Sequence, residues 1–80
     1  MTPADLARAA NDAYAISGTV LGLAAALTAQ QIGCCLEPSG DIVCYYDQTS
    51  TILHQAPLGY WTAIPTDRVL AGTAYYGGVR

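Results

Sequence analysis

The cysteines and the histidine are the side chains of this sequence best suited to metal binding or nucleophilic chemistry. Cys34 and Cys35 are adjacent, Cys44 follows nine residues later, and His54 is the only histidine. Three thiolates and an imidazole could bind Zn²⁺, but adjacent ligands depart from the spacing that zinc sites use. We therefore expect no metal site.

The same cysteines could instead form a disulfide. A hairpin that turns symmetrically about residues 39–40 places Cys35 directly opposite Cys44, with β-carbons about 4.5–5.5 Å apart, which is near disulfide range. Cys34 would then point to the other face. An odd number of cysteines without a secretory signal is more typical of a reducing compartment, where thiols act as small apolar residues. We expect core thiols and a cytoplasmic protein, and a Cys35–Cys44 bond stays the alternative.

The remaining titratable residues do not form a catalytic pattern. A cysteine nucleophile needs a lowered pKa, as at a helix N-terminus, whereas these thiols lie in a predicted strand. No glycine-rich phosphate loop precedes a helix. Turn carboxylates more often shape the turn than transfer protons, and four of the acids occupy predicted turns: Glu37, Asp41, Asp47 and Asp67. We expect neither an enzyme nor a cofactor.

The aromatic residues carry the clearest functional signal. The chain has six tyrosines and one tryptophan but no phenylalanine, and Tyr and Trp are enriched in binding hot spots. Alternation along a strand should send one ring of each adjacent pair outward, toward a rim of turn acids. The alternative is that tyrosine serves only as a strand former on a solvated face. The predicted partner-binding residues are Tyr45, Tyr46, Asp47, Tyr60, Trp61, Asp67, Tyr75 and Tyr76, with Tyr60 and Trp61 favoured because they follow the turn at 57–59.

A long helix is predicted to support these residues. Thr2, Pro3 and Asp5 have the pattern of an N-cap, a first-turn proline and a capping-box acid. Apolar residues then recur at steps of three and four to about residue 32, where Gly33 could end the helix. The opposite side presents a stripe of small residues that suits close packing against a second copy, which predicts a homodimer through Gly18, Gly22, Ala25 and Ala29.

Strands and turns follow the helix. Residues 34–37, 41–46, 49–54 and 60–64 are short β-type runs separated by turn sequences, so neighbouring strands should pair antiparallel. Residues 68–76 could form a last strand or a short helix, and their composition favours the strand. The predicted fold is α+β. One domain spans residues 1–80, with one long helix at about 3–32 packed on a small antiparallel sheet of three to four strands in region 33–80.

The charge balance excludes several classes of protein. There are only three cations, all arginine, and the net charge is −3, so the phosphate-binding patch of a nucleic-acid binder is missing. The uncharged stretch 13–32 is diluted by Ser, Thr, Gln and Gly, which makes a membrane anchor an unfavoured reading. So few charges on so small a domain favour a surface that is covered by a copy of itself or by a partner.

Taken together, a small acidic domain with Tyr, Trp and Asp on one face resembles the phage-encoded inhibitors of host defence, such as anti-CRISPR proteins. The resemblance is one of size and acidity and covers no motif. It implies a non-catalytic protein-binding module that occludes a basic, nucleic-acid-handling host protein. The alternatives are a structural subunit of a virion or other homo-oligomeric assembly, or a small membrane-anchored subunit.

Overall fold

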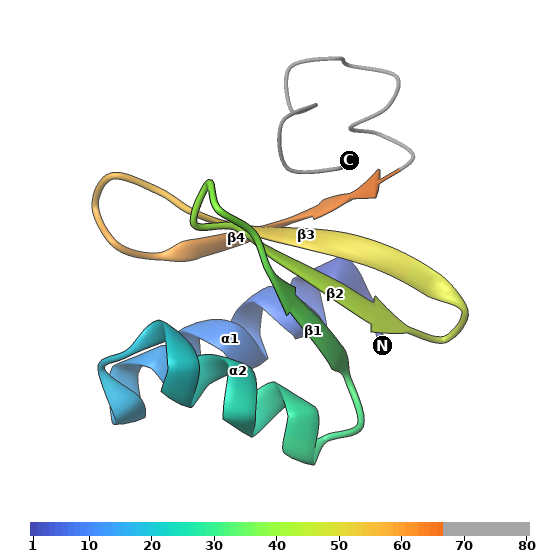
Figure 1. Ribbon diagram of the computed structural model, residues 1–80, viewed down its shortest axis with the longest axis horizontal. Helices are drawn as coiled ribbons and strands as arrows, with labels where there is room; N and C mark the ends of the chain where they lie inside the picture. The colour runs from blue at the N-terminus through green and yellow to red at the C-terminus, as the bar shows by residue number, and fades with distance from the viewer. Residues whose placement is uncertain (67–80) are drawn as a thin grey trace.

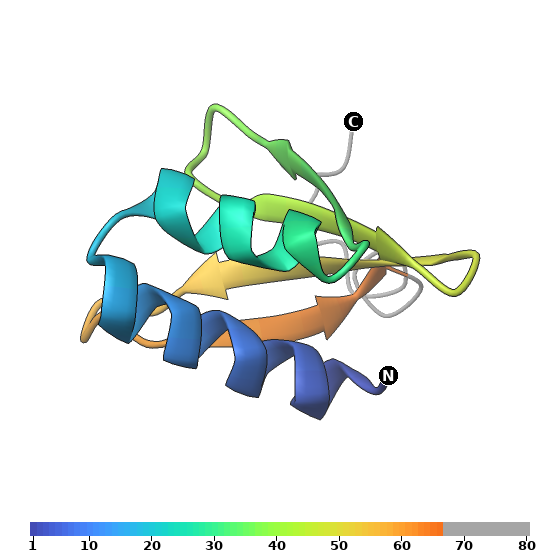
Figure 2. The same cartoon turned by 90° about the horizontal axis from the view of Figure 1, so that it is seen from below.

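The protein is described by a computed structural model for residues 1–66, which form two helices and a four-stranded sheet. Both helices lie on one face of the sheet, and consecutive strands are neighbours in the order β1-β2-β3-β4, all antiparallel (Figures 1 and 2). The α+β class and the antiparallel sheet are therefore confirmed. In chain order the elements are α1 (Pro3–Ser17), α2 (Val20–Ala29), β1 (Gly33–Leu36), β2 (Ile42–Tyr46), β3 (Thr49–Gln55) and β4 (Trp61–Pro65).

The prediction of one long helix is wrong. The capping box of Thr2 and Asp5 starts α1 as expected, but Gly18 ends that helix with a left-handed φ of 72°. Thr19 then caps a second helix by accepting a hydrogen bond from the Gly22 amide. A capping threonine after a left-handed glycine interrupts the ladder of helical hydrogen bonds, which the spacing of apolar residues does not reveal. Ile16, one of the apolar residues at this helical spacing, is 87% exposed.

The helix break also explains the two glycines of the small-residue stripe. A β-carbon at Gly22 would lie 2.4 Å from the β-carbon of Ser17, so only glycine lets α2 start this close to the end of α1. Gly18 lies in the turn, while Gly22, Ala25 and Ala29 lie on α2. The four residues therefore do not form a stripe on one helix, and both glycines have a role within a single molecule.

Two hairpin loops with the same sequence pattern set the register of the sheet. Loops 38–40 and 57–59 each read Pro-x-Gly, and their glycines have positive φ values of 96° and 105°. A three-residue hairpin loop that ends in a left-handed residue is a common connection. It shifts the first hairpin by one residue from the predicted register, so Cys34 lies opposite Cys44 and Cys35 lies opposite Val43. The predicted Cys35–Cys44 pairing is wrong, and the cysteines are free thiols.

The main core lies between the sheet and the two helices. Its largest side chain, Trp61, packs edge to face against Tyr14 of α1, with ring centroids 5.7 Å apart. A smaller apolar cluster of Val43, Ile52 and Ile64 lies on the opposite face of the sheet. The buried residues of the main core are Leu6, Ala10, Leu23, Leu27, Ile32, Ile42, Cys44, Leu53 and Trp61.

One side chain joins α1 directly to the backbone of β4. The Asn11 carboxamide accepts a hydrogen bond from the Trp61 amide at 2.7 Å and donates one to the Trp61 carbonyl at 3.0 Å. Trp61 lies on the outermost strand, so without Asn11 its N–H and C=O groups would have no hydrogen-bond partner. Asn11 thus caps the β4 edge where the helix crosses it.

In the part of the chain that the structure describes, neither helix has the length and apolar character needed to cross a membrane. The predicted last element at 68–76 lies outside the described residues.

Candidate binding site

The structure places the described aromatic residues by the expected alternation. Tyr45 is 53% exposed and Tyr60 is 54% exposed, whereas their neighbours Tyr46 and Trp61 turn toward the helices. Trp61 is only 1% exposed, so its predicted role in contacting a partner is wrong. The pairs follow the two-residue repeat of a strand, and the buried member is the one facing the helices. Asp67, Tyr75 and Tyr76 lie outside the described residues.

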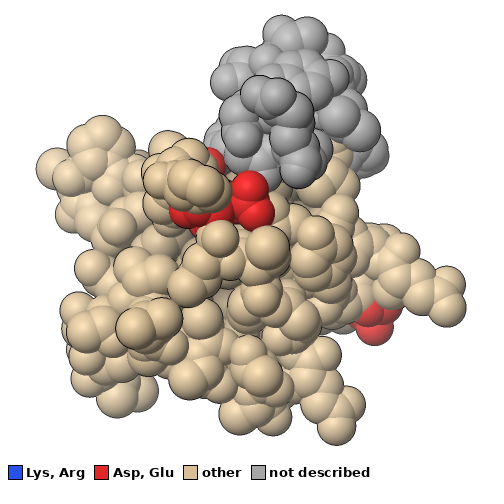
Figure 3. Space-filling view, in the orientation of Figure 1, with Lys and Arg blue, Asp and Glu red and all other residues tan. Residues whose placement is uncertain are grey.

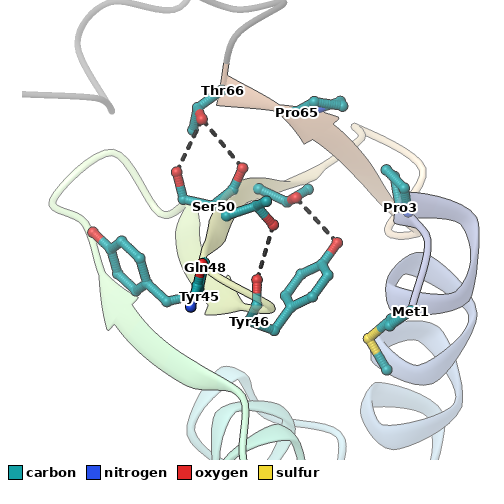
Figure 4. Close-up of a pocket in the computed structure, with 10 residues that line it drawn as sticks. Met1, Pro3, Tyr45, Tyr46, Gln48, Ser50, Pro65 and Thr66 are labelled. Carbon is teal, nitrogen blue, oxygen red and sulfur yellow. Dashed lines mark hydrogen bonds between the residues drawn. The ribbon is translucent and has the colours of Figure 1, made fainter.

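Tyr45 and Tyr46 border a hollow at the end of the sheet where β2 turns into β3. Figure 4 shows the ring of Tyr46 on the side of Met1 and Pro3, and the ring of Tyr45 on the other side. The hollow has a volume of about 960 Å³ and is lined by the N-terminal residues, the β2–β3 hairpin and the end of β4. The lining residues are Met1, Pro3, Tyr45, Tyr46, Gln48, Thr49, Ser50, Thr51, Pro65 and Thr66.

The turn at one side of the hollow is tight. Asp47 and Gln48 both have positive φ, 51° and 60°, as a two-residue type I′ hairpin turn requires. The turn leaves Tyr46 opposite Thr49 and Tyr45 opposite Ser50. The two tyrosines are therefore held at the last paired positions of the hairpin, directly before the chain reverses.

Hydrogen bonds between hydroxyl groups fix the walls of the hollow. The Tyr46 hydroxyl lies 3.1 Å from Thr51 Oγ1, and the Ser50 hydroxyl lies 2.9 Å from Thr66 Oγ1 (Figure 4). Thr66 also donates to the Ser50 carbonyl, which ties the end of β4 to β3. The half-buried Tyr46 ring is thus oriented by its neighbour, while no such bond restrains the exposed Tyr45 hydroxyl among the described residues.

The electrostatic setting of the hollow is nearly neutral. Among residues 1–66, its lining contains no acidic or basic side chain, although the exposed Asp47 lies beside it and pairs with the Met1 amino group at 3.4 Å. In Figure 3, the described part of the visible face shows acidic side chains in two separate places and no lysine or arginine. The site therefore offers rings and hydroxyl groups, with a single acidic residue at its edge.

A second polar cluster, which the sequence did not predict, lies at the opposite end of the sheet. Asp41 is 6% exposed, and its carboxylate lies 2.8 Å from His54 Nδ1 and accepts a hydrogen bond from the Ser39 hydroxyl at 3.0 Å. Asp41 is thus not the exposed rim acid that the sequence indicated. The serine bonds to the carboxylate, whereas nucleophilic attack would require it to bond to the imidazole. The contacts of Asp41 with Ser39 and His54 therefore stabilise the turn between β1 and β2.

Two of the thiols, those of Cys44 and Cys35, have raised pKa values. Burial, and secondarily the neighbouring Cys34, raises the pKa of Cys44 to about 12. A hydrogen bond to the Glu37 carboxylate raises the pKa of the exposed Cys35. Because the thiolate is the nucleophile and the metal ligand, neither cysteine is activated. Within residues 1–66 no group of three or more histidine, cysteine or acidic side chains could hold a metal ion.

Comparisons with protein-family models, with curated proteins and with solved structures find no significant match to this chain.

Proposed function

We propose that this protein is a small non-catalytic binding module that contacts another protein through the hollow beside Tyr45 and Tyr46. The observation that carries the proposal is the combination of a wide, nearly neutral concavity with a half-exposed tyrosine at its edge. Tyrosine supplies a large apolar surface and a hydroxyl group at a low cost in conformational entropy, which is why it is common in binding hot spots.

The chemistry of the lining favours a protein partner over a charged small molecule. A phosphate or carboxylate ligand would favour basic side chains, which the described lining lacks, and the amino group of Met1 is already paired with Asp47. Hydroxyl groups and rings instead suit a neutral side chain or a backbone segment. The exposed Asp47 and the net charge of −3 would favour a partner with a basic surface around the contact.

The partner class that we propose is a host protein that handles nucleic acid, of the CRISPR type, with this chain acting as a phage or mobile-element inhibitor in the cytoplasm. Small size, acidity and a surface poor in charge support this reading. Occlusion of a protein surface fits a net charge of −3 better than imitation of DNA, because a DNA mimic would need a dense row of carboxylates.

The test is inhibition of purified CRISPR effector complexes by the parent chain and by two matched variants. Tyr45→Ala should weaken binding by roughly thirty-fold to a thousand-fold, as for other hot-spot tyrosines. Leu58→Ala is the control, because Leu58 is 90% exposed in the loop at the other end of the sheet and is not a predicted contact residue. It should bind like the parent.

Two results would contradict the proposal. Equal binding by the parent and Tyr45→Ala would remove the hollow as the contact site. The absence of inhibition across effector types, at protein concentrations where the chain is folded, would remove the proposed partner class.

A further inference from the structure

The two outer strands of the sheet differ in how their backbone groups are satisfied. In an antiparallel pair, residues alternate between positions whose N–H and C=O groups face the neighbouring strand and positions whose groups face away. The Glu37 amide donates to the Asp41 carbonyl at 2.9 Å, which fixes this alternation for the first hairpin. Cys35 therefore faces β2, and Cys34 and Leu36 turn their backbone groups outward.

Strand β4, at the other edge, follows the same alternation. The Ala56 amide donates to the Tyr60 carbonyl at 2.8 Å, so the backbone groups of Trp61 should face away from β3. They do, and Asn11 binds both of them. Pro65, which also faces away from β3, has no backbone N–H group to donate. Ala63, the outward-facing residue between Trp61 and Pro65, has no hydrogen-bond partner among the described residues. The β4 edge is therefore only partly closed to another strand.

The β1 edge has no comparable protection. Among the described residues, no hydrogen-bond partner is found for the outward N–H and C=O groups of Cys34 and Leu36. The strand carries no charge and no proline, which are the usual means of preventing edge-to-edge pairing. Leu36 is also 45% exposed although it lies on the helix-covered face of the sheet. Figure 2 shows β1 at the periphery, with no described element beyond it.

We propose that β1 is an interface at which two copies of this chain pair as antiparallel strands around a two-fold axis at Cys35. In this register Cys34 of each copy faces Leu36 of the other, and the outward groups of both residues form four hydrogen bonds. The two sheets then become one sheet of eight strands with all four helices on the same face.

The side chains of the edge are compatible with this register. Each exposed Leu36 comes to lie beside Cys34 and α2 of the other copy, since α2 packs over β1. Each Glu37 faces Gly33 of the other copy, so the two carboxylates sit at opposite ends of the paired strands, roughly 13 Å apart. The outward N–H and C=O groups of the two copies have the same spacing, because the two strands are identical.

The protection of β4 by Asn11 and Pro65 disfavours the addition of further copies at that edge. A sheet with two open edges could add strands without end, whereas one open and one partly protected edge favours a closed, isologous dimer. This contact differs from the helix surface that the sequence indicated, and it does not depend on the proposed partner.

The first test is sedimentation of the full chain and of two leucine variants at micromolar concentration. The parent should be a dimer. Leu36→Lys should weaken dimerisation by roughly tenfold or more, because an ammonium group would have to leave water at the interface. Leu58→Lys adds the same charge at a 90% exposed loop position away from the edge and should dimerise like the parent. Circular dichroism should show both variants folded.

The second test uses the thiol at the centre of the interface. Opposed residues at that position have Cα atoms about 4.5 Å apart, within disulfide range. Diamide, which accepts two electrons and two protons from a pair of thiols, should therefore link the two copies through Cys35, and Cys35→Ser should form no covalent dimer while still sedimenting as one. A monomeric parent, a dimer that Leu36→Lys leaves intact, or a covalent dimer of Cys35→Ser would each overturn the proposal.

Discussion

The two edges of this sheet show how differently a small protein can treat the same backbone groups. At β4, the carboxamide of Asn11 takes both the N–H and the C=O of Trp61, and Pro65 removes a further donor. At β1, the outward groups of two neutral residues, Cys34 and Leu36, have no described partner. The chain itself satisfies part of the β4 edge, whereas it provides no such partner at the β1 edge.

The difference follows from where the helices pass. The first helix runs beside β4, which brings a polar side chain within reach of the strand backbone. The second helix packs over β1 from the face of the sheet and contributes no polar side chain to its edge, because its residues are almost entirely apolar or small. Association through the sheet is therefore directed to one side of the molecule.

The largest effect is expected on the free energy of unfolding, when the hydrogen bonds of Asn11 to the β4 edge are removed. Asn11→Ala would leave two backbone groups of the nearly fully buried Trp61 without partners, and each such group costs about 1–3 kcal/mol. We expect the free energy of unfolding to fall by about 2–4 kcal/mol, a large part of the stability of so small a domain. Urea denaturation at low protein concentration measures this loss.

Asp12→Ala is the matched control for that variant. Asp12 is the next residue of the helix and is exposed, so its replacement should change the free energy of unfolding by no more than about 0.5 kcal/mol. If Asn11→Ala is as stable as Asp12→Ala, water or another group satisfies the β4 edge, and the contrast between the two edges disappears.

A smaller effect is expected at the open edge, in the reactivity of its exposed thiol. The hydrogen bond from Cys35 to the Glu37 carboxylate stabilises the protonated thiol and raises its pKa. Glu37→Gln removes the negative charge, lowers the pKa and increases the thiolate fraction at mildly alkaline pH. Alkylation of Cys35 by iodoacetamide, followed by mass spectrometry, should become a few times faster.

Two controls accompany the alkylation experiment. Asp47→Asn removes an acid at the far end of the sheet and should leave the rate for Cys35 unchanged. Cys44, with its pKa raised to about 12, should stay unmodified while the protein is folded. A rate for Glu37→Gln equal to that of the parent would show that the carboxylate does not control the thiol.

Much of the fold could be predicted because local chemistry marks its elements. The capping box at Thr2 and Asp5 gave the start of the first helix, and the turn sequences separated all four described strands. The break at Gly18 was missed because apolar residues keep helical spacing across it. The end of α2 was also misplaced: Gln31, with a φ of 66°, takes the left-handed position expected for Gly33.

The candidate site was predicted in part. Strand alternation indicated that one ring of each pair would be exposed, which is correct for Tyr45 and Tyr60, but it could not decide between Tyr60 and Trp61. The contact of Asp41 with His54 was missed although the two-residue turn at 47–48 sets the register of β2 and β3, which pairs Ile42 with Leu53 and so brings the residues next to that pair together. In the first hairpin, the Pro-x-Gly sequence at 38–40 is the signal that could have shown the register that places Cys34 opposite Cys44.

Amide hydrogen exchange, resolved by residue and repeated over a range of protein concentrations, tests the contrast between the edges most directly. The Trp61 amide should be protected at every concentration, because Asn11 accepts its hydrogen bond within one molecule. The amides of Cys34 and Leu36 should exchange freely in dilute protein and become protected together as the concentration rises. Unchanged, rapid exchange of these two amides in concentrated protein, beside a protected Trp61, would show that the β1 edge stays open and would contradict the account.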